Sequence, residues 1–521
     1  MYKVNLNNYL FYALLIIILM LLLGINPFLK YPFDMYAHLE GIDKQYSANS
    51  LSGHRVLWYW IWAKIFHLFS IDNSQVFLRA YFIHYSQILI SFGGVFYFSY
   101  IFIKNFFKNI DKLSIKYLAL WSTLIWFTVY ATNSMGIHQV WILWYSINYQ
   151  ITLVIVLVML GLTISIFYEN QKFIYKIFYL ILVFFMGKIV LQMHVMELLY
   201  YIMYIFIFSL VYIDKIYLFL KKHKIIGFAI LITVIVLIVK LPLFVENFES
   251  KSSRIIPYLS LDKMPDLYTQ IMRDGAALVN GLNRANASMN ELIYISLFFI
   301  LLMFILYLIR FFKNKDNLIN SRLLLFLILA SSFVLIPVFQ FTSGLAGMLV
   351  SSIDVVNRFY YSSLIFLVIP LFVYSLISII GKKNIIIMNI LIISILLSTF
   401  IYSRFDIGHN QNYYKNIKSL IRAYNKNNVG FNLSNKEIEQ IALLKEKYKK
   451  DLNISNPYFF AREDIAFVLK HIYNENADMP EHYNGGLLSV NYYIKDYNKS
   501  KRKNKILFKT PKDFSNYAPF K

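Results

Sequence analysis

The chain has 521 residues, of which 58% are hydrophobic and 15% are charged. Apolar runs long enough to cross the roughly 30 Å of a bilayer's hydrocarbon recur along the chain, which excludes a soluble multidomain protein. The net charge of +23 does not predict nucleic-acid binding, because the Lys and Arg residues form short clusters between apolar runs. Cysteine is absent, which excludes a disulfide framework, a thiol nucleophile and a Cys-based metal site.

Apolar windows predict the membrane helices. The first exceeds the apolar part of a secretory signal, and no small-residue cleavage site follows it, so we expect it to be retained. The full set predicts an all-α polytopic membrane domain over residues 1–402, with about eleven transmembrane helices. The windows lie near 8–29, 78–103, 117–132, 148–167, 173–190, 197–214, 225–245, 291–312, 322–341, 358–380 and 384–402.

Basic connections predict the orientation of these helices. Together with Lys3, the charged connections alternate onto one side, which the positive-inside rule makes cytoplasmic. Abundant Ile, Lys, Asn, Tyr and Phe are typical of an AT-rich bacterial genome, so we expect a multi-pass protein of the bacterial inner membrane. The long loops 30–77 and 246–290 and the tail then lie outside. The charged connections are 103–116, 168–176, 214–224, 310–322 and 381–384.

The first outer loop carries "YPFDMYAHLEGIDK" at 31–44, directly after the first predicted helix. The following aromatic segment 53–69, "GHRVLWYWIWAKIFHLF", predicts a helix on the outer membrane surface, with a short tilted span as the alternative. Asp34 would be held, partly desolvated, between the two helices. Such a carboxylate suits a general base or a metal ligand. The alternative is an interface carboxylate paired with Arg55 or Lys44.

A second cluster of ionisable residues occupies 187–197, "GKIVLQMHVME", between two apolar windows. Ionisable residues at such depth usually face a cavity and are functional. We expect Lys188 and His194 to face a donor phosphate, while Glu197 pairs with one of them or contacts an acceptor. His194 and Glu197 are spaced i, i+3 on one predicted helix face, which also suits a metal, so a divalent ion such as Mg or Mn stays open.

Two further outer segments carry candidate substrate contacts. In 134–150, His138 and Asn148 accompany tryptophans that suit sugar rings, although an ordinary interface belt is the favoured explanation of the tryptophans. In the loop 246–290, Pro257 and Pro265 disfavour one continuous helix, and the segment is interpreted as a lid that donor or acceptor orders.

The tail, 403–521, is richer in Lys and Asn and predicts a small, mainly helical extracytoplasmic domain. Ser434 and Glu437 form a capping box ahead of a predicted helix at 435–452. A second helix is expected over 461–474 and a short strand over 505–510, "KILFKT". The alternative is a packing appendage without chemistry.

Two motifs, "FDMYAHL" at 33–39 and "NRFYYSSLIFLVIPL" at 357–371, resemble the GT-C superfamily of polytopic glycosyltransferases. The resemblance implies inverting transfer of a sugar from a polyprenyl-phosphate donor to a glycan or lipid acceptor on the outer leaflet. Asp34 matches the catalytic acidic position, with Tyr36 and His38 as neighbours. Arg358 matches an arginine that begins a late helix near the donor phosphate.

This sequence departs from the family's double-acidic motif, because Met35 follows Asp34. The metal requirement therefore stays open, with Glu40 or Asp43 as the alternative second acid. The planar guanidinium of arginine suits phosphate oxygens, so the other arginines on the predicted outer face are further candidates for binding the donor phosphate. These are Arg55, Arg254, Arg273 and Arg284.

Three other functions stay open. A polysaccharide polymerase or ligase shares the outer-face arginines, but it is expected to concentrate several of them in one late loop. A transporter or lipid flippase predicts repeat symmetry and charge at mid-membrane, neither of which the sequence shows clearly. A scaffold would use the tail to bind partners without catalysis.

Overall fold

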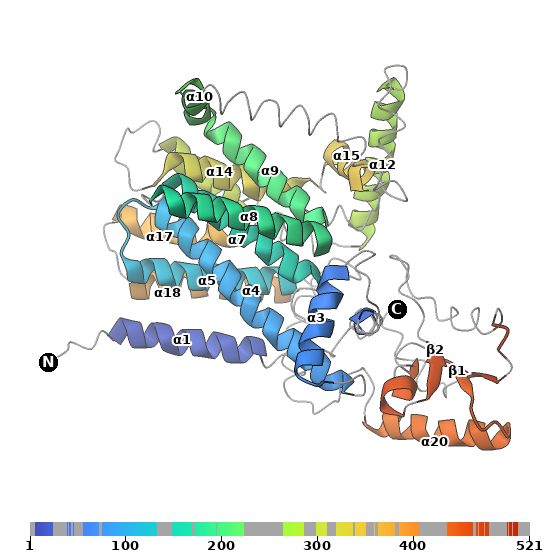
Figure 1. Ribbon diagram of the computed structural model, residues 1–521. Helices are drawn as coiled ribbons and strands as arrows, with labels where there is room; N and C mark the ends of the chain where they lie inside the picture. Colours follow the sequence, from blue (N-terminus) through green and yellow to red (C-terminus); the bar gives the residue numbers. More distant parts are fainter. Residues whose placement is uncertain are drawn as a thin grey trace. The chain divides into compact units, whose positions relative to one another are not determined.

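The computed structural model is mostly α-helical, as the sequence predicts (Figure 1). It describes residues 6–23, 39, 41–42, 45, 56–71, 75–132, 148–168, 172–193, 195–222, 264–285, 298–309, 319–336, 339–350, 359, 363–380, 385–405, 435–461, 465–466, 468–473, 475–478, 498, 500–502 and 504–508. Statements about structure below concern these residues.

The chain divides into two compact units. The first unit comprises Met1–Leu15, Phe92–Gln139 and Thr152–Asn416, and the second comprises Ile16–Ser91, Val140–Ile151 and Ile417–Lys521. Three helices contribute residues to both units: α1 (Leu6–Leu23), α4 (Val76–Phe106) and α7 (Asn148–Tyr168). The predicted domain boundary at residues 402 and 403 stays a prediction.

Most helices of the first unit lie within the predicted apolar windows, whereas Ile213–Lys222, Met264–Ala285 and Gln340–Val350 lie mainly in predicted connections. The predicted window 225–245 lies outside the described residues. Buried aromatic rings of α4 join several of these helices: Phe98 contacts Phe366, and Phe102 contacts Phe326, with ring centroids 6.2 and 6.4 Å apart. The helices are α5 (Lys112–Thr132), α8 (Phe173–Met193), α9 (Val195–Val211), α10 (Ile213–Lys222), α12 (Met264–Ala285), α14 (Ser321–Ser331), α15 (Gln340–Val350), α17 (Ile365–Ile380) and α18 (Ile385–Phe405).

Three described helices are long and apolar enough to cross a membrane, namely Leu78–Phe106, Gln150–Tyr168 and Phe173–Met193. Shorter apolar helices include Asn8–Met20, Glu197–Val211 and Ile365–Ser378. On α8, Phe173 and Phe184 are 78% and 72% exposed. A large exposed apolar surface of this kind marks a membrane or protein contact, and the apolar helices therefore indicate membrane association.

The window 322–341 is not one helix, contrary to the prediction. Its α-helical part, α14, ends at Ser331, a 3-10 helix follows at Ser332–Leu335, and α15 begins only at Gln340. Pro337 lies between them in the sequence and has no backbone N–H to continue a helix. Side chains bind the carbonyls released here: Thr342 Oγ1 donates to the Ile336 oxygen at 2.7 Å.

The late window 358–380 also differs from the prediction. The helix does not begin at Arg358, because α17 begins at Ile365, and Ser363 and Leu364 precede it without helical structure. In the predicted outer loop 246–290, residues 264–285 form one helix, α12, with Pro265 at its start, where proline is tolerated. Residues 264–285 of this predicted loop therefore form a helix that packs against α15.

Helices α12 and α15 approach closely at two glycines. A Cβ on Gly275 would collide with the carbonyl oxygen of Gln340, and one on Gly344 would collide with that of Ile271. The Gln340 side chain donates from Nε2 to the Met272 oxygen at 2.7 Å. Glycine has no side chain, which permits such close backbone contact between two helices.

Three of the predicted cytoplasmic connections meet at one end of the first unit. Phe107 and Ile319 form an antiparallel bridge, and the Asn320 N–H donates to the Phe106 oxygen at 2.8 Å. Asn320 also caps α14 through its side chain. Arg322 and Asp214 form a bidentate ion pair at 2.8 and 2.6 Å. Residues from 103–116, 214–224 and 310–322 are thus brought together.

In the second unit, helix α3 (Val56–Leu68) confirms the helix predicted over 53–69. It buries Trp58 and Trp62, and the Trp62 ring meets Phe82 of α4 at 6.1 Å. Arg79 of α4 is 1% exposed and donates from Nη2 to the Ile71 oxygen at 2.9 Å. This bond ties the chain after α3 to the start of α4.

The described part of the tail contains a parallel sheet as well as helices. Strands β1 (Tyr458–Phe460), β2 (Asn476–Asp478) and β3 (Lys505–Leu507) have the order β2-β1-β3. Helix α20 (Asn435–Asp451) and strand β3 confirm two predicted elements, whereas β1 and β2 were not predicted. Within the predicted helix 461–474, Val468–Ile472 form a π-helical turn.

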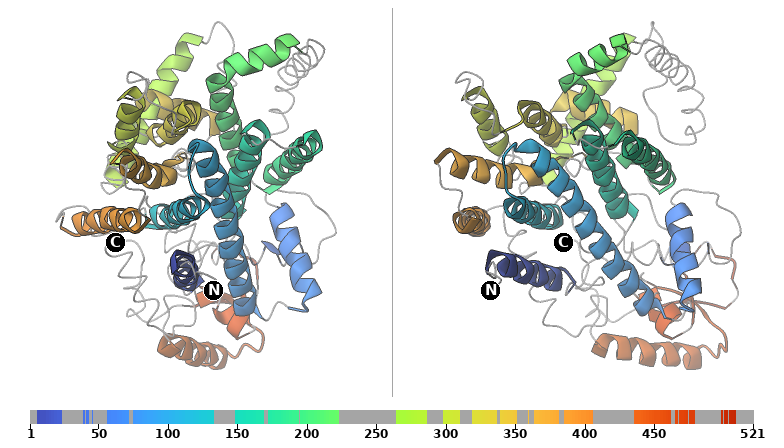
Figure 2. Two further views of the ribbon diagram at one scale, coloured as in Figure 1. Left: turned by 90° about the vertical axis from the view of Figure 1, so that its left-hand side faces the viewer. Right: turned by 60° about the vertical axis from the view of Figure 1, so that its left-hand side comes forward.

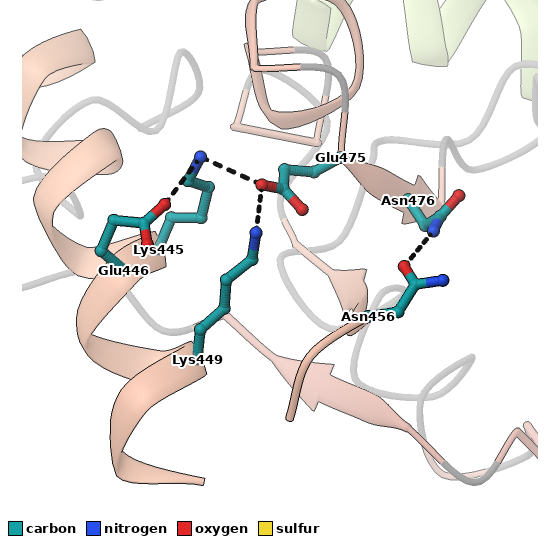
Figure 3. Close-up of polar contacts among 6 residues, drawn as sticks. All are labelled: Lys445, Glu446, Lys449, Asn456, Glu475 and Asn476. Atoms are coloured by element: carbon teal, nitrogen blue, oxygen red, sulfur yellow. Dashed lines mark hydrogen bonds and ion pairs between the residues drawn. The ribbon is translucent and has the colours of Figure 1, made fainter. Parts of the chain in front are cut away.

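A shared carboxylate joins α20 to the sheet (Figure 3). Glu475 lies 3.0 Å from the Lys445 ammonium and 2.5 Å from that of Lys449, and Lys445 also reaches Glu446 at 3.0 Å. The Lys445 and Glu475 side chains are only 12% and 11% exposed. Removing one partner from such a pair would leave a partly buried charge uncompensated, which is destabilising.

Candidate functional site

One face of α9 carries a buried carboxylate followed by buried aromatic rings. Glu197 lies in the first turn and is 4% exposed. Tyr200, Tyr204, Phe208 and Tyr212 continue the same face at helical spacing, each at most 2% exposed. The N-terminal turn of a helix favours negative charge, which explains in part how a carboxylate is tolerated here.

This face packs on the two irregular segments of the first unit. The Tyr200 ring meets Phe359 edge-on at 5.4 Å, and the Tyr204 ring stacks on Phe333 of the 3-10 helix at 5.4 Å. The buried Ser363 hydroxyl donates to the Ser331 oxygen at 2.8 Å. Backbone without regular hydrogen bonding is tolerated at membrane depth where it is buried in protein or lines a cavity.

We call Glu197, Tyr200, Tyr204, Phe333 and Phe359 the α9 site. It joins the predicted cluster 187–197 to the motif 357–371, because Phe359 directly follows Arg358 in the sequence. All five side chains are at most 5% exposed, so they form a packed cluster of aromatic rings with a buried carboxylate on the same face of α9. The contact between Tyr200 and Phe359 thus brings α9, which begins within the cluster 187–197, to the motif.

One detail of the cluster 187–197 differs from the prediction. Helix α8 ends at Met193 and α9 begins at Val195, and His194 lies outside the described residues, so its shared helix face with Glu197 stays a prediction. Lys188 lies on α8 with an exposed side chain, whereas Glu197 is buried on α9. The two predicted partners therefore have different environments.

Most of the other predicted site residues lie outside the described residues. Asn148 is the first residue of α7. The predicted residues without a described placement are Asp34, Tyr36, His38, Arg55, His138, His194 and Arg358.

The residues that follow the first motif are described in part. Leu39 and Ile42 are buried, at 3% and 0% exposure. Gly41 lies against Tyr59 of α3, because a Cβ on Gly41 would come within 2.7 Å of the Tyr59 ring. The chain directly after "FDMYAH" is therefore packed on the predicted interface helix.

The second unit contains a buried row of polar side chains that was not predicted from the sequence. On α4, Arg79, His84, Gln87 and Ser91 are each at most 1% exposed. Gln150 of α7 donates from Nε2 to the Ser91 hydroxyl at 3.0 Å. The spacing of 84, 87 and 91 along one helix face was the available signal, hidden by the high mean hydropathy of the window. Polar residues in such a helix face the protein interior.

The described residues contain no group of three or more His, Asp or Glu side chains that could hold a metal ion. The divalent ion considered from the sequence would depend on acidic residues of the first loop, and Asp34, Glu40 and Asp43 lie outside the described part of the chain.

No family model, curated protein or solved structure matches the chain.

Proposed function

We propose that the chain is an integral-membrane glycosyltransferase of GT-C type in the bacterial inner membrane. It has about eleven membrane helices and a cytoplasmic N-terminus. It transfers a sugar from a polyprenyl-phosphate donor to a glycan or lipid acceptor at the outer face. Asp34 is the general base that takes the acceptor hydroxyl proton.

The contact between Tyr200 and Phe359 carries this proposal. It supports one shared site for the segments 187–197 and 357–371, each of which was predicted from the sequence to contact the donor. Glu197, one helical turn before Tyr200, binds acceptor or donor hydroxyls. Arg358, adjacent to Phe359 in the sequence, stabilises the leaving phosphate with its guanidinium fork.

Activity of the purified chain in lipid nanodiscs tests the proposal. A panel of radiolabelled polyprenyl-phosphate sugars is offered with membrane glycolipid extract as acceptor, and label transfer is measured. Asp34→Asn should lower the rate about 10²- to 10⁴-fold, the usual contribution of a general base. Asp266→Asn is the matched control, because Asp266 is exposed on α12.

Variants of the α9 site separate its role from folding. Arg358→Ala should remove transfer, while Arg358→Lys should keep part of it because an ammonium binds phosphate as a point charge. Glu197→Gln should raise the KM for one substrate. Normal transfer by folded Asp34→Asn and Arg358→Ala proteins would refute the assignment.

A lipid-linked glycan flippase is the second candidate, favoured by the interrupted helix between α14 and α15. Discontinuous helices form the substrate sites of many transporters. The same preparation in sealed vesicles distinguishes the two. A flippase moves a fluorescent lipid-linked sugar across the bilayer without forming a new glycosidic bond. A polymerase or ligase is recognised by its product, a lengthened or transferred glycan.

A further inference from the structure

Helix α10 is a short amphipathic helix that follows the apolar helix α9. Residues 213, 216, 217 and 220 are apolar and recur at the spacing of one helix face. Ile213 and Tyr217 on this face are each 62% exposed. The described part of the chain does not cover these two side chains.

The other side of α10 is basic. It carries Lys215, and Lys221 and Lys222 close the helix. Its one acidic residue, Asp214, is neutralised by the bidentate pair with Arg322. The hydrogen bonds from Arg322 hold the pKa of the Asp214 carboxyl below its usual value. The side of the helix opposite Ile213 and Tyr217 therefore carries a net positive charge, with Leu218 exposed between its lysines.

A packing contact holds the start of α10. Tyr212, at the turn between α9 and α10, is buried, and its ring faces the Arg322 guanidinium at 5.2 Å. The helix turns away from the line of α9 at this point (Figure 2). An amphipathic helix that turns at the end of an apolar one is suited to the headgroup layer.

We propose that α10 lies in the membrane surface and binds anionic phospholipid headgroups through Lys215, Lys221 and Lys222. The apolar face formed by Ile213 and Tyr217 enters the boundary between headgroups and acyl chains. The exposed side chains of Lys215 and Lys221 extend toward lipid phosphates, and the pair between Asp214 and Arg322 holds the first turn in place. A zwitterionic surface offers the same apolar contact but little net attraction for these lysines.

A single-cysteine label tests the position of the helix, since the natural chain has no cysteine. The Tyr217→Cys protein carries a bimane fluorophore and is reconstituted in phosphatidylcholine vesicles with or without phosphatidylglycerol. Brominated forms of each lipid act as quenchers. Both should quench the label, with brominated phosphatidylglycerol quenching more strongly than its share of the lipid predicts. A label at Leu443→Cys, on exposed α20, serves as the unquenched reference.

Charge variants test the lysines. The labelled protein is also made with three substitutions together, Lys215→Gln, Lys221→Gln and Lys222→Gln. This variant should lose the preference for phosphatidylglycerol, to which each lysine contributes roughly fivefold. Replacing the same lysines by arginine should keep it. Replacing the exposed tail residues Lys447, Lys450 and Lys501 by glutamine should leave it unchanged.

Two results would overturn the proposal. Absence of quenching by either lipid would place α10 away from the bilayer and leave its apolar face to a protein partner. Equal quenching by both lipids, unaffected by the lysine substitutions, would leave an interfacial helix without selection of anionic lipid. Thermal unfolding of each variant confirms that it is folded before it is compared.

Discussion

Glu475 pairs with two lysines of α20 in the described part of the tail. Its carboxylate is shared by Lys445 and Lys449, at 3.0 and 2.5 Å, in a setting where Lys445 is only 12% exposed. Glu475→Gln keeps the size but removes the charge, so both ammonium groups lose a charged partner. We expect a loss of about 2 kcal/mol, the scale of a hydrogen bond to a charged group.

Hydrogen exchange of the α20 amides in the full chain measures this loss. Exchange from α20 should quicken in Glu475→Gln while the helices of the first unit keep their protection. Glu439→Gln is the matched control, because Glu439 is exposed on the same helix. Equal exchange in the two variants would show that the carboxylate adds nothing to tail stability.

Lys445 gives the same cluster a predictable pH dependence. Burial disfavours its charged form, but hydrogen bonds to Glu446 and Glu475 outweigh burial and raise the pKa above the usual 10.5. Because the folded-state pKa is raised, the stabilisation is fully present below pH 10.5 and is lost as the pH rises through the folded-state value. Tail unfolding should therefore become easier above pH 10.5. Lys445→Met should lose less stability than the natural chain over this alkaline range.

At the scale of elements, the glycines of α12 and α15 give a sharp test of packing. Gly275→Ala places a methyl group against the Gln340 carbonyl, so the helices must separate, at about 1–3 kcal/mol for an overpacked contact. Gly93→Ala is the control within the same unit, because a Cβ there meets nothing within 4 Å. Thermal unfolding and hydrogen exchange of α12 compare the two. A Gly275→Ala protein as stable as Gly93→Ala would mean that the two helices are not in contact at these glycines.

The elements also show what the sequence could predict. Apolar length located the most apolar helices, such as α4, α7 and α8, because membrane helices need a continuous apolar run, but it did not locate α10 or α12. It did not locate the interruption after Ser331, since the backbone there is satisfied by the distant hydroxyl of Ser363 and by Thr342. Strands β1 and β2 have three residues each, too short for an alternating pattern to be read.

The candidate site was predictable only in its parts. Glu197 stood out as a carboxylate between apolar windows, and it is buried in the structure. Its neighbours Tyr204 and Phe333 did not stand out, because aromatic residues are common in such helices and their contact joins distant segments. The same holds for His84 and Gln87, whose burial depends on the packing of α4.

For the whole molecule, the alternation of basic connections predicts which side of the membrane each loop faces. The structure brings together residues of three such connections, through the Phe107–Ile319 bridge and the Arg322–Asp214 pair. Single cysteines test the sidedness, since the natural chain has none. Lys108 and Lys172 are exposed in two basic connections, and Leu443 is 73% exposed in the tail.

A membrane-impermeant maleimide should therefore label Leu443→Cys in intact spheroplasts, and label Lys108→Cys and Lys172→Cys only in inverted membrane vesicles. The physical reason is that lysine-rich connections are retained on the cytoplasmic side during insertion. Labelling of Lys108→Cys in spheroplasts would reverse the orientation and remove the outer-face location of Asp34. If both Lys108→Cys and Leu443→Cys are labelled from the cytoplasmic side, the number of membrane spans between them differs from the predicted number by an odd number. Detergent-solubilised protein, in which all three cysteines react, is the reference for complete labelling.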